Sequence, residues 1–429
     1  MKKHVLAISV PLMGHTNQLI ALSEELACRG YTVSIVIHPT AKAWVTGHNI
    51  QFIPWEFNLA TSDDEYVTQK DTFWHKISQE PHPWRSNQLM LERVIAFYRP
   101  MYESLKSLLQ EHHPDCLVID RAVVPAIDLA IQQQLPFIIQ TRFLGNFVKP
   151  SFHQPQFGTD YPMQMNLWQK SLNFLGPRLE TFYLLPTMLK LNRVRQDCAH
   201  QKDLPSPWDN QTMIVGTSFG IEQERPLPAK VHMVGPIFSN SQKPVEDSLR
   251  QWLESDLGRT KVIYMAFGTL ATLNAWQAIA LIEGLVETGL KVLWSLPENQ
   301  RSILPNLPST VRVESFVPQA AVLSHPNVVV FVSHCGMNGI HESLYYGKPI
   351  LALPFFGDQH YNAARLVDLG VALKLNKRNF SRIDVSDKIN QLLHDQCYQE
   401  RALQMSRMLK QTDGLNQAAQ IVETVLQAI

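Results

Sequence analysis

The stretch Ser333–Gly339, SHCGMNG, places histidine, cysteine and asparagine side chains directly after the apolar run Val328–Ser333. Histidine and cysteine are common zinc ligands, but zinc sites place their ligands in pairs at recognisable spacings. His334 and Cys335 are neighbours at a strand end, so their side chains point apart, and His341 has no further ligand one helical turn later. The spacing disfavours a metal. It leaves two interpretations, a turn with a hydrogen-bonded histidine and a pocket for an anion.

The anion pocket follows from the helix that is expected to begin within this stretch. The first backbone N–H groups of a helix have no internal partner and carry the positive end of its dipole, which makes a ready anion site. Gly336 and Gly339 leave room for a ligand to approach, and His334 and Asn338 add side-chain donors. Glu342 lies one turn beyond Asn338 on the same helical face, where a carboxylate suits the vicinal hydroxyls of a sugar.

A glycine followed by a hydroxyl-bearing residue, Gly268–Thr269, stands at the end of another predicted strand, in YMAFGTL. A hydroxyl at such a turn can donate to a phosphate. The same pair also fits an ordinary strand-to-helix turn, and the residues alone do not choose between the two.

The candidate for acid–base chemistry is His15, in PLMGHTNQL, at the end of the first predicted strand. An imidazole titrates near neutrality and can accept a proton from a hydroxyl. Asp120, which ends the strand CLVID, is the candidate to orient it; Asp115 precedes that strand and is expected to point away. A lone histidine in such a turn is more often structural, so the residues alone leave both roles open.

Short apolar strands alternate with helical patterns in two blocks of the chain, and this alternation predicts parallel sheets covered on both faces. The polar, proline-containing stretch 236–248 is expected to link the blocks. We therefore predict an α/β protein with two doubly wound Rossmann-like domains facing a central cleft. The expected domains are 1–237 and 238–410, with a C-terminal helix, 411–429, packing back on the first. Ligands of such sheets bind outside the carboxyl ends of the strands.

Composition narrows the class of protein. Lys plus Arg number 38 and Asp plus Glu number 38, so no net charge attracts nucleic acid, and none is expected as a partner. The 5 cysteines are scattered and form no CxxC pair, which favours a reducing compartment and a cytoplasmic protein. The basic, apolar start resembles a secretory signal, but no cleavage site follows and a first strand fits better. No apolar run reaches the ~18 residues of a spanning helix.

From Phe316 to Gln359 the chain reads FVPQAAVLSHPNVVVFVSHCGMNGIHESLYYGKPILALPFFGDQ. This run closely resembles the signature of the UDP-glycosyltransferase family, with its PQ, H, HCG-N, E, G-P, P and DQ positions in register. A weaker resemblance extends to the GH turn and the FGT turn. The chain looks most like bacterial members that act on small lipophilic molecules. The resemblance implies the GT-B fold, a nucleotide-sugar co-substrate, no further cofactor and no metal.

The resemblance also implies roles for single residues. Phe316, with Val317 beside it, replaces the usual Trp that stacks on uracil, and Met337 replaces a Trp common in plant members, which leaves thymine open beside uracil. Gln359 at the end of the signature favours glucose over galactose or glucuronic acid. The remaining implied donor contacts are Gln319 and Glu342 for the ribose, His334, Gly336, Asn338 and Gly339 for the diphosphate, Gly268 and Thr269 for a phosphate, and Asp358 with Gln359 for the sugar hydroxyls.

His15 matches the catalytic histidine of the family and Asp120 matches the carboxylate that orients it. Direct attack by a base-activated hydroxyl predicts inversion at the anomeric carbon, and the absence of an Asp-x-Asp triplet fits a metal-independent reaction. We therefore expect an inverting transferase of a hexose from a UDP-sugar. The alternatives are a nucleotide-sugar epimerase or hydrolase of the same fold and a non-catalytic binding protein.

The segment from about 141 to 205 carries the clues to the acceptor. It is rich in aromatic and aliphatic residues, which favours a small lipophilic alcohol such as a carotenoid, a sterol or a macrolide. Its plainest interpretation is a pair of packed helices. The alternative is a wall of the acceptor pocket, and the apolar and basic residues of Leu179–Arg195 also predict a peripheral contact with a membrane surface.

Overall fold

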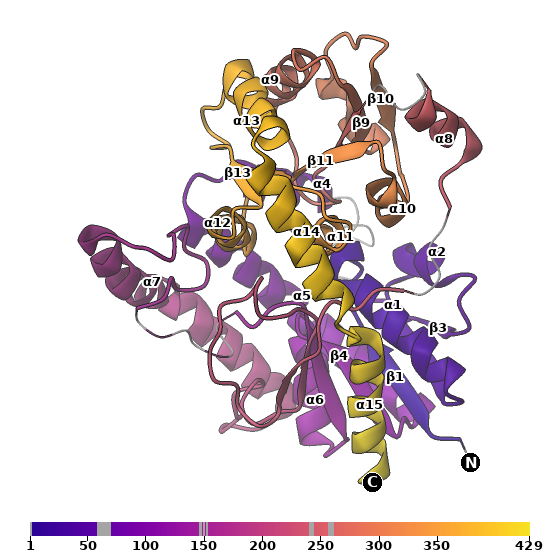
Figure 1. Ribbon diagram of the computed structural model, residues 1–429. Helices are drawn as coiled ribbons and strands as arrows, with labels where there is room; N and C mark the ends of the chain where they lie inside the picture. Colours follow the sequence, from indigo (N-terminus) through magenta and orange to yellow (C-terminus); the bar gives the residue numbers. More distant parts are fainter. Residues whose placement is uncertain are drawn as a thin grey trace.

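The computed structural model describes residues 2–57, 70–145, 148, 151, 153–239, 244–255 and 261–429 (Figure 1). Residues 240–243 of the expected linker lie outside these ranges. Two parallel sheets form two stacked domains, so the predicted α/β fold with two doubly wound domains is confirmed. The C-terminal domain lies above the N-terminal domain in Figure 1.

The N-terminal sheet has the order β3-β2-β1-β4-β5-β6-β7. Its strands are β1 (His4–Ile8), β2 (Thr32–Ile37), β3 (Gln51–Pro54), β4 (Cys116–Asp120), β5 (Phe137–Thr141), β6 (Met213–Val215) and β7 (Val231–Met233). The helices described in this part are α1 (Met13–Cys28), α2 (Lys42–Val45), α4 (Lys70–Gln79), α5 (Pro83–His112), α6 (Val124–Gln132) and α7 (Leu167–Ala199).

The C-terminal sheet has the order β10-β9-β8-β11-β12-β13. Its strands are β8 (Val262–Ala266), β9 (Lys291–Ser295), β10 (Val311–Glu314), β11 (Val328–Ser333), β12 (Ile350–Ala352) and β13 (Ala372–Lys374). The helices are α8 (Asp247–Glu254), α9 (Ala275–Val286), α10 (Gln319–Ser324), α11 (Met337–Tyr345), α12 (Gln359–Asp368), α13 (Arg382–His394), α14 (Gln396–Lys410) and α15 (Gly414–Gln427).

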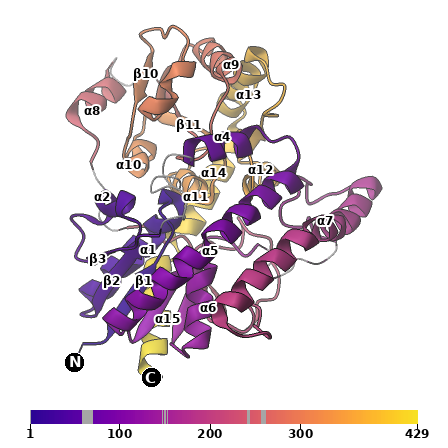
Figure 2. The ribbon, with the colours of Figure 1, turned by 180° about the vertical axis from the view of Figure 1, so that it is seen from behind.

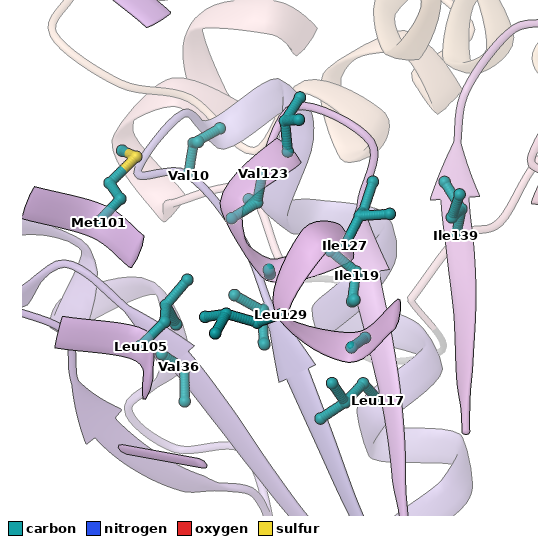
Figure 3. Packing of buried hydrophobic residues seen from close by; sticks show 14 of the residues in the cluster. Val10, Val36, Met101, Leu105, Leu117, Ile119, Val123, Ile127, Leu129 and Ile139 are labelled. Carbon is teal, nitrogen blue, oxygen red and sulfur yellow. The ribbon is translucent and has the colours of Figure 1, made fainter. Parts of the chain in front are cut away.

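Strand β1 shows why the N-terminal strands are apolar throughout. Successive side chains of a strand point to opposite faces of the sheet. Leu6 and Ile8 pack in one buried cluster with α5 and α6, part of which Figure 3 shows, whereas Val5 and Ala7 pack on the other face with α1 and α15. Both faces are covered by helices, so neither set can be polar.

Helix α15 crosses from the second half of the chain to the N-terminal domain. Its residues Ala418, Val422 and Leu426 are buried in the same cluster as β1 and α1. Arg29 at the end of α1 forms an ion pair of 2.8 Å with Glu423. Helix α14 leads into this crossing, and both views place the C-terminus near the N-terminus (Figures 1 and 2). The last helix therefore ties the two domains together.

Segment 141–205 differs from the predicted pair of packed helices. It contains one long helix, α7, which packs along α5 and holds Pro177 and Pro186 within it. Proline removes a backbone donor and usually breaks a helix, which is why the sequence indicated a break. Asn166 and Gln169 close a capping box at the start of α7, and packing against α5 keeps the helix continuous past both prolines.

The region from α4 to the start of α5 leaves the N-terminal domain and packs against the C-terminal one. Ile77 of α4 and Leu89 of α5 are buried in a cluster with residues of β8, α9 and β12. Lys377 donates to the carbonyl of Ser78 at 2.9 Å, and Trp74 stacks on Phe356 with ring centroids 5.6 Å apart. Helix α4 and the start of α5 therefore connect the two domains near the carboxyl ends of their sheets (Figure 2).

Candidate active site

A cavity of about 1770 Å³ opens between the carboxyl ends of the two sheets. Ligand pockets commonly measure ~300–1,000 Å³, so this cavity has room for more than one substrate. It is lined from the N-terminal domain by the turn around His15 and by Arg121 and Arg142, and from the C-terminal domain by His334 and Glu342. Residues that lie far apart in the sequence therefore face one space.

The start of α11 forms the centre of the C-terminal wall. Gly336 is the N-cap and has extended backbone, so the first N–H groups of the helix face the cavity. His334 Nδ1 and Asn338 Oδ1 are buried and have no hydrogen-bond partner in the part of the chain that the structure describes. Unsatisfied buried polar atoms are uncommon in folded proteins, and here they point to a ligand with polar groups.

His334 is held as a neutral ring. Burial lowers its pKa to about 4, against the opposing charge of Asp358 and the carbonyl of Ala266. Two glycines make room for the ring, since a Cβ at Gly336 would lie 2.5 Å from Nε2 of His334 and one at Gly268 would lie 2.9 Å from its Cε1. The packing of His334 therefore requires glycine at both positions, whether or not a ligand also approaches them.

Tyr264, Gln319 and Glu342 form a chain of hydrogen bonds in the C-terminal wall of the cavity. The Tyr264 hydroxyl donates to Gln319 Oε1 at 3.2 Å, and the Gln319 amide donates to the Glu342 carboxylate. Burial raises the pKa of Glu342 to about 7, and the hydrogen bond from Gln319 opposes this rise. The two residues that the resemblance assigns to the ribose therefore lie in contact, with a carboxylate poised to ionise near neutrality.

Phe316 stands at the rim of the cavity with 67% of its surface exposed. An exposed aromatic ring at a ligand site offers a face on which a base can stack. Its neighbour Val317 is 3% exposed and packs in the core. Gly268 and Thr269 follow β8, are exposed, and line the same space.

Asp358 and Gln359 lie at the start of α12 and both line the cavity. Asp358 Oδ2 accepts a hydrogen bond of 2.8 Å from Asn362, whose amide also donates to the carbonyl of Cys335 at 3.0 Å. Gln359 uses its side-chain oxygen to accept from the backbone N–H groups of Phe355 at 2.8 Å and Phe356 at 3.2 Å. Only the amide nitrogen of Gln359 is thus left for a sugar hydroxyl.

His15 and Asp120 are in direct contact in the N-terminal wall. His15 lies in the first turn of α1, and its Nδ1 is 2.9 Å from the Asp120 carboxylate, which is only 1% exposed. A carboxylate accepts but does not donate, so the neutral ring carries its proton on Nδ1 and presents the lone pair of Nε2. Nε2 is therefore the atom that can take a proton from a hydroxyl.

Opposing effects set the pKa of His15. Burial and then the charge of Arg142 lower it, whereas the charge and the hydrogen bond of Asp120 raise it. The net direction is downward, so the ring is neutral at pH 7 and able to act as a base. Asp115 is not part of this arrangement, because it lies before β4 and accepts from the backbone N–H of His4 at 2.6 Å.

The sequence interpretation missed several residues of the cavity. Arg142 follows β5, donates to the carbonyl of Gly14, and contacts Nε2 of His15 at 3.1 Å. His341, considered above only as a metal ligand, is buried at the domain interface and bonds Thr217 at 2.9 Å. No motif marked either residue, because both acquire their partners only through the meeting of distant segments.

Asn338 also joins the two domains directly. Its amide donates to the carbonyl of Gly14 at 3.1 Å, beside the catalytic candidate His15. The residue that the resemblance assigns to the diphosphate therefore touches the turn that carries the proposed base. One hydrogen bond, between Asn338 and Gly14, therefore links the proposed diphosphate contact to the turn that carries the proposed base.

Two parallel α/β domains with one cavity between their carboxyl ends define the GT-B class of glycosyltransferases. The family model described as UDP-glucoronosyl and UDP-glucosyl transferase matches residues 23–427, and the chain belongs to this family. The family predicted from the signature is thereby confirmed.

The chain is similar to proteins from fungi and from mammals. It is 28% identical over 363 residues to UDP-glycosyltransferase 1 of Phaeomoniella chlamydospora, covering 79% of this chain and 74% of that protein. It is 26% identical over 428 residues to UDP-glucuronosyltransferase 2B17 of Homo sapiens, covering 92% of this chain and 78% of that protein. It spans only 63% of the length of UDP-glycosyltransferase stmC of Aspergillus ustus.

Solved structures share the fold along the whole chain. A UDP-glucose: anthocyanidin 3-O-glucosyltransferase in complex with UDP matches with a TM-score of 0.70 and 19% identity, covering 100% of each chain. The glycotransferase of kitacinnamycin matches with a TM-score of 0.73 and 19% identity, covering 99% of each chain.

Proposed function

We propose that this protein is an inverting glucosyltransferase that moves glucose from UDP-glucose to a hydroxyl of a small lipophilic alcohol. The observation that carries this proposal is the His15–Asp120 pair, which faces the same cavity as the start of α11. A protein that only binds nucleotide sugars needs an anion site but no oriented base. An epimerase or hydrolase needs no large apolar wall.

In this reaction the acceptor hydroxyl gives its proton to Nε2 of His15 as its oxygen attacks the anomeric carbon. The bond from that carbon to the diphosphate oxygen breaks, and UDP leaves from the opposite face, so the configuration inverts. Asp120 stabilises the imidazolium that forms. The N–H groups at the start of α11 stabilise the charge that develops on UDP, and the proposed reaction uses no metal ion.

The donor assignment rests on the signature residues in the C-terminal wall. Gln319 and Glu342 would hold the ribose, and the start of α11 would hold the diphosphate. Asp358 and the free amide of Gln359 would bind the sugar hydroxyls, which favours the neutral glucose over glucuronic acid. Phe316 would stack on uracil or thymine.

The acceptor assignment rests on the apolar half of the cavity. Helices α4, α5 and α7 supply most of this lining, and their residues are mainly aliphatic or aromatic. The lining includes Phe73, Trp74, Met90, Val94, Phe97, Met101, Leu184, Met188 and Leu191. Such a wall favours an acceptor with an extended apolar body.

The experiment is a mass-spectrometric screen of lipophilic alcohols with UDP-glucose and TDP-glucose, with and without EDTA. We expect a product heavier by one hexose, with UDP-glucose as the better donor and unchanged yield in EDTA. Conversion of the donor without any glycoside, or transfer abolished by EDTA, would contradict the proposal. A screen with neither turnover nor glycoside would favour the non-catalytic alternative.

We also propose that the outer face of α7 contacts an anionic membrane surface, at the cytoplasmic side. Large apolar side chains stand exposed along it, including Phe182 with 76% and Trp168 with 71% of their surface, and Lys170 and Arg193 are exposed among them. Figures 1 and 2 show α7 at the side of the N-terminal domain. None of the described helices is both long and apolar enough to cross a bilayer.

Two observations favour a lipid surface as the partner of this face. Apolar residues bordered by cations suit the boundary between acyl chains and anionic headgroups. The inner side of the same helix lines the acceptor cavity. Arg195, counted in the expected contact, is buried and paired with Asp128 at 2.8 Å and takes no part. Phe182→Ser should reduce the amount of protein that sediments with phosphatidylserine vesicles. The membrane contact would be contradicted if the variant and the unchanged protein sediment equally, or if neither of them sediments with the vesicles.

A further inference from the structure

Arg142 forms a hydrogen bond with Nε2 of His15, the atom that takes the proton in the proposed reaction. Its guanidinium donates from Nη2 to Nε2 of His15 at 3.1 Å, and from Nη1 to the carbonyl of Gly14. A guanidinium can only donate, so Nε2 must be the acceptor in this contact. An acceptor hydroxyl can reach Nε2 only after the guanidinium has moved away.

Arg142 lies in a position that favours an anion. It is 8% exposed and its charge interacts with that of Asp120, but within the described ranges no carboxylate lies within 4.0 Å of its guanidinium. Arg121 lines the same end of the cavity, with its guanidinium 4.1 Å from the ring centroid of Phe143. Burial, and next the charge of Arg142, lower the pKa of Arg121 to about 10. A buried cation gains when a bound ligand supplies the opposite charge.

The rest of the cavity limits which anion can bind here. The diphosphate would lie at the start of α11, and the sugar would lie against Asp358, itself a carboxylate. The apolar residues of α4, α5 and α7 line the same cavity as His15 and Arg142. Arg142 Nη1 and Asn338 Nδ2 donate to the same carbonyl of Gly14, so the guanidinium borders the start of α11 as well as His15. The group that displaces it must lie next to the hydroxyl that replaces it on Nε2 of His15, which favours an anion carried by the acceptor.

We propose that Arg142, with Arg121 beside it, binds a carboxylate that the acceptor carries close to its reactive hydroxyl. This inference rests on the proposed transfer to a lipophilic alcohol and specifies that alcohol as an amphiphilic hydroxy acid. The carboxylate draws the guanidinium off His15 while the hydroxyl takes its place on Nε2. Arg142 is thus a positioning residue that admits this acceptor to the base.

Binding tests the carboxylate site without requiring transfer. The probes are β-hydroxydecanoate and its methyl ester, which share the hydroxyl and the apolar chain, measured by calorimetry with UDP present. We expect the acid to bind at least about tenfold more tightly than the ester to the unchanged protein, since only the acid can form a charge-assisted pair with the guanidinium. Arg142→Gln should abolish that preference, and Arg142→Lys should restore part of it. The exposed Arg250→Gln on α8 serves as the matched control.

Kinetics tests the effect on the base. The charged groups that face His15 are Asp120 and Arg121 from the end of β4 and Arg142 from the end of β5. Because Arg142 lowers the pKa of His15, its removal raises that pKa, and the acid limb of kcat/KM should move to higher pH in Arg142→Gln. With β-hydroxydecanoate, KM should rise at least about tenfold; with the ester, KM should stay within about twofold.

Three outcomes would overturn the inference. Equal binding of acid and ester to the unchanged protein would remove the carboxylate site, even if transfer to neutral alcohols is found. A preference that persists in Arg142→Gln would assign it to another residue. If the unchanged protein transfers from UDP-glucuronate and Arg142→Gln abolishes this transfer with every acceptor, the carboxylate that Arg142 binds belongs to the donor sugar. Absence of any transfer, with the acid preference intact, would instead refute only the proposed function.

Discussion

The two walls of the cavity are built in different ways. The donor wall comes almost entirely from one continuous stretch, 316–359, in which strand, turn and helix follow one another. The acceptor wall is assembled from the turn after β1, the ends of β4 and β5, and helices α4, α5 and α7. A site made within one stretch is readable from its motif, whereas a site made from six segments is readable only after folding.

The walls also differ in how they treat charge. The donor wall uses backbone N–H groups, a neutral histidine and two carboxylates, Asp358 and Glu342, the second with a pKa of about 7. The acceptor wall places Asp120 on one ring nitrogen of His15 and Arg142 on the other, with Arg121 nearby, so opposing charges set the state of the base. Fixed dipoles suit a donor that is always an anion, and tunable charges suit a step in which a proton moves.

The largest effect is expected on the acceptor side. His15→Ala should lower kcat by about 10²–10⁴-fold, the usual contribution of a general base, while the affinity for UDP stays within about twofold. Product formation by mass spectrometry and UDP binding by calorimetry measure the two quantities. His394→Ala, on the exposed face of α13, is the control. Unchanged turnover in His15→Ala would refute the assignment of His15 as the general base. A large loss of UDP affinity would refute the claim that donor binding and base catalysis belong to separate walls.

A smaller effect, confined to the donor side, is expected from Glu342. Its pKa is about 7, so its carboxylate, which we propose accepts from the ribose hydroxyls, becomes ionised as the pH rises through neutrality. UDP affinity should therefore rise by up to about tenfold between about pH 6 and pH 8. Glu342→Gln should bind UDP more weakly and lose the part of this rise that exceeds the titration of UDP itself.

The matched control for that measurement is Asp358→Asn, in the part of the donor wall assigned to the sugar. This variant should keep the pH dependence of UDP affinity, since its carboxylate is not assigned to the nucleotide. Identical pH profiles for Glu342→Gln and the unchanged protein would rule out the ribose role of Glu342.

The smallest effect concerns the contact that joins the walls. Burial lowers the pKa of His341 to about 3, well below that of an exposed histidine, so below about pH 6.5 the unfolded chain binds a proton that the folded chain does not. The stability from this residue is complete above that pH and falls by roughly 1.4 kcal/mol per pH unit below it. His341→Gln, which can still bond Thr217, should show a smaller loss of stability from pH 7 to about pH 5.5 in urea unfolding.

His394→Gln is the control for this comparison, because His394 is exposed on α13. It should lose stability with falling pH as the unchanged protein does. An equal slope in His341→Gln would mean that the interface histidine is not the group that titrates on unfolding.

The amino-acid sequence determined the alternation of strands and helices, and hence two parallel sheets, because apolar strands buried on both faces have few other solutions. It also determined most of the donor wall, because a strand, a turn and a helix start in succession fix where His334, Asn338 and Glu342 lie relative to one another. The pairing of His15 with Asp120 was predicted from the resemblance, and parallel neighbours β1 and β4 bring the two together.

Only the tertiary structure decided what lies around that pair. Arg142 reaches Nε2 of His15 because β5 lies next to β4, and His341 meets Thr217 because the domains close on each other. The continuous α7 survives two prolines because α5 supports it. Each of these contacts joins residues with no fixed spacing in the chain, so local patterns carried no signal for them. The acceptor side is therefore the part of this protein that only folding specifies.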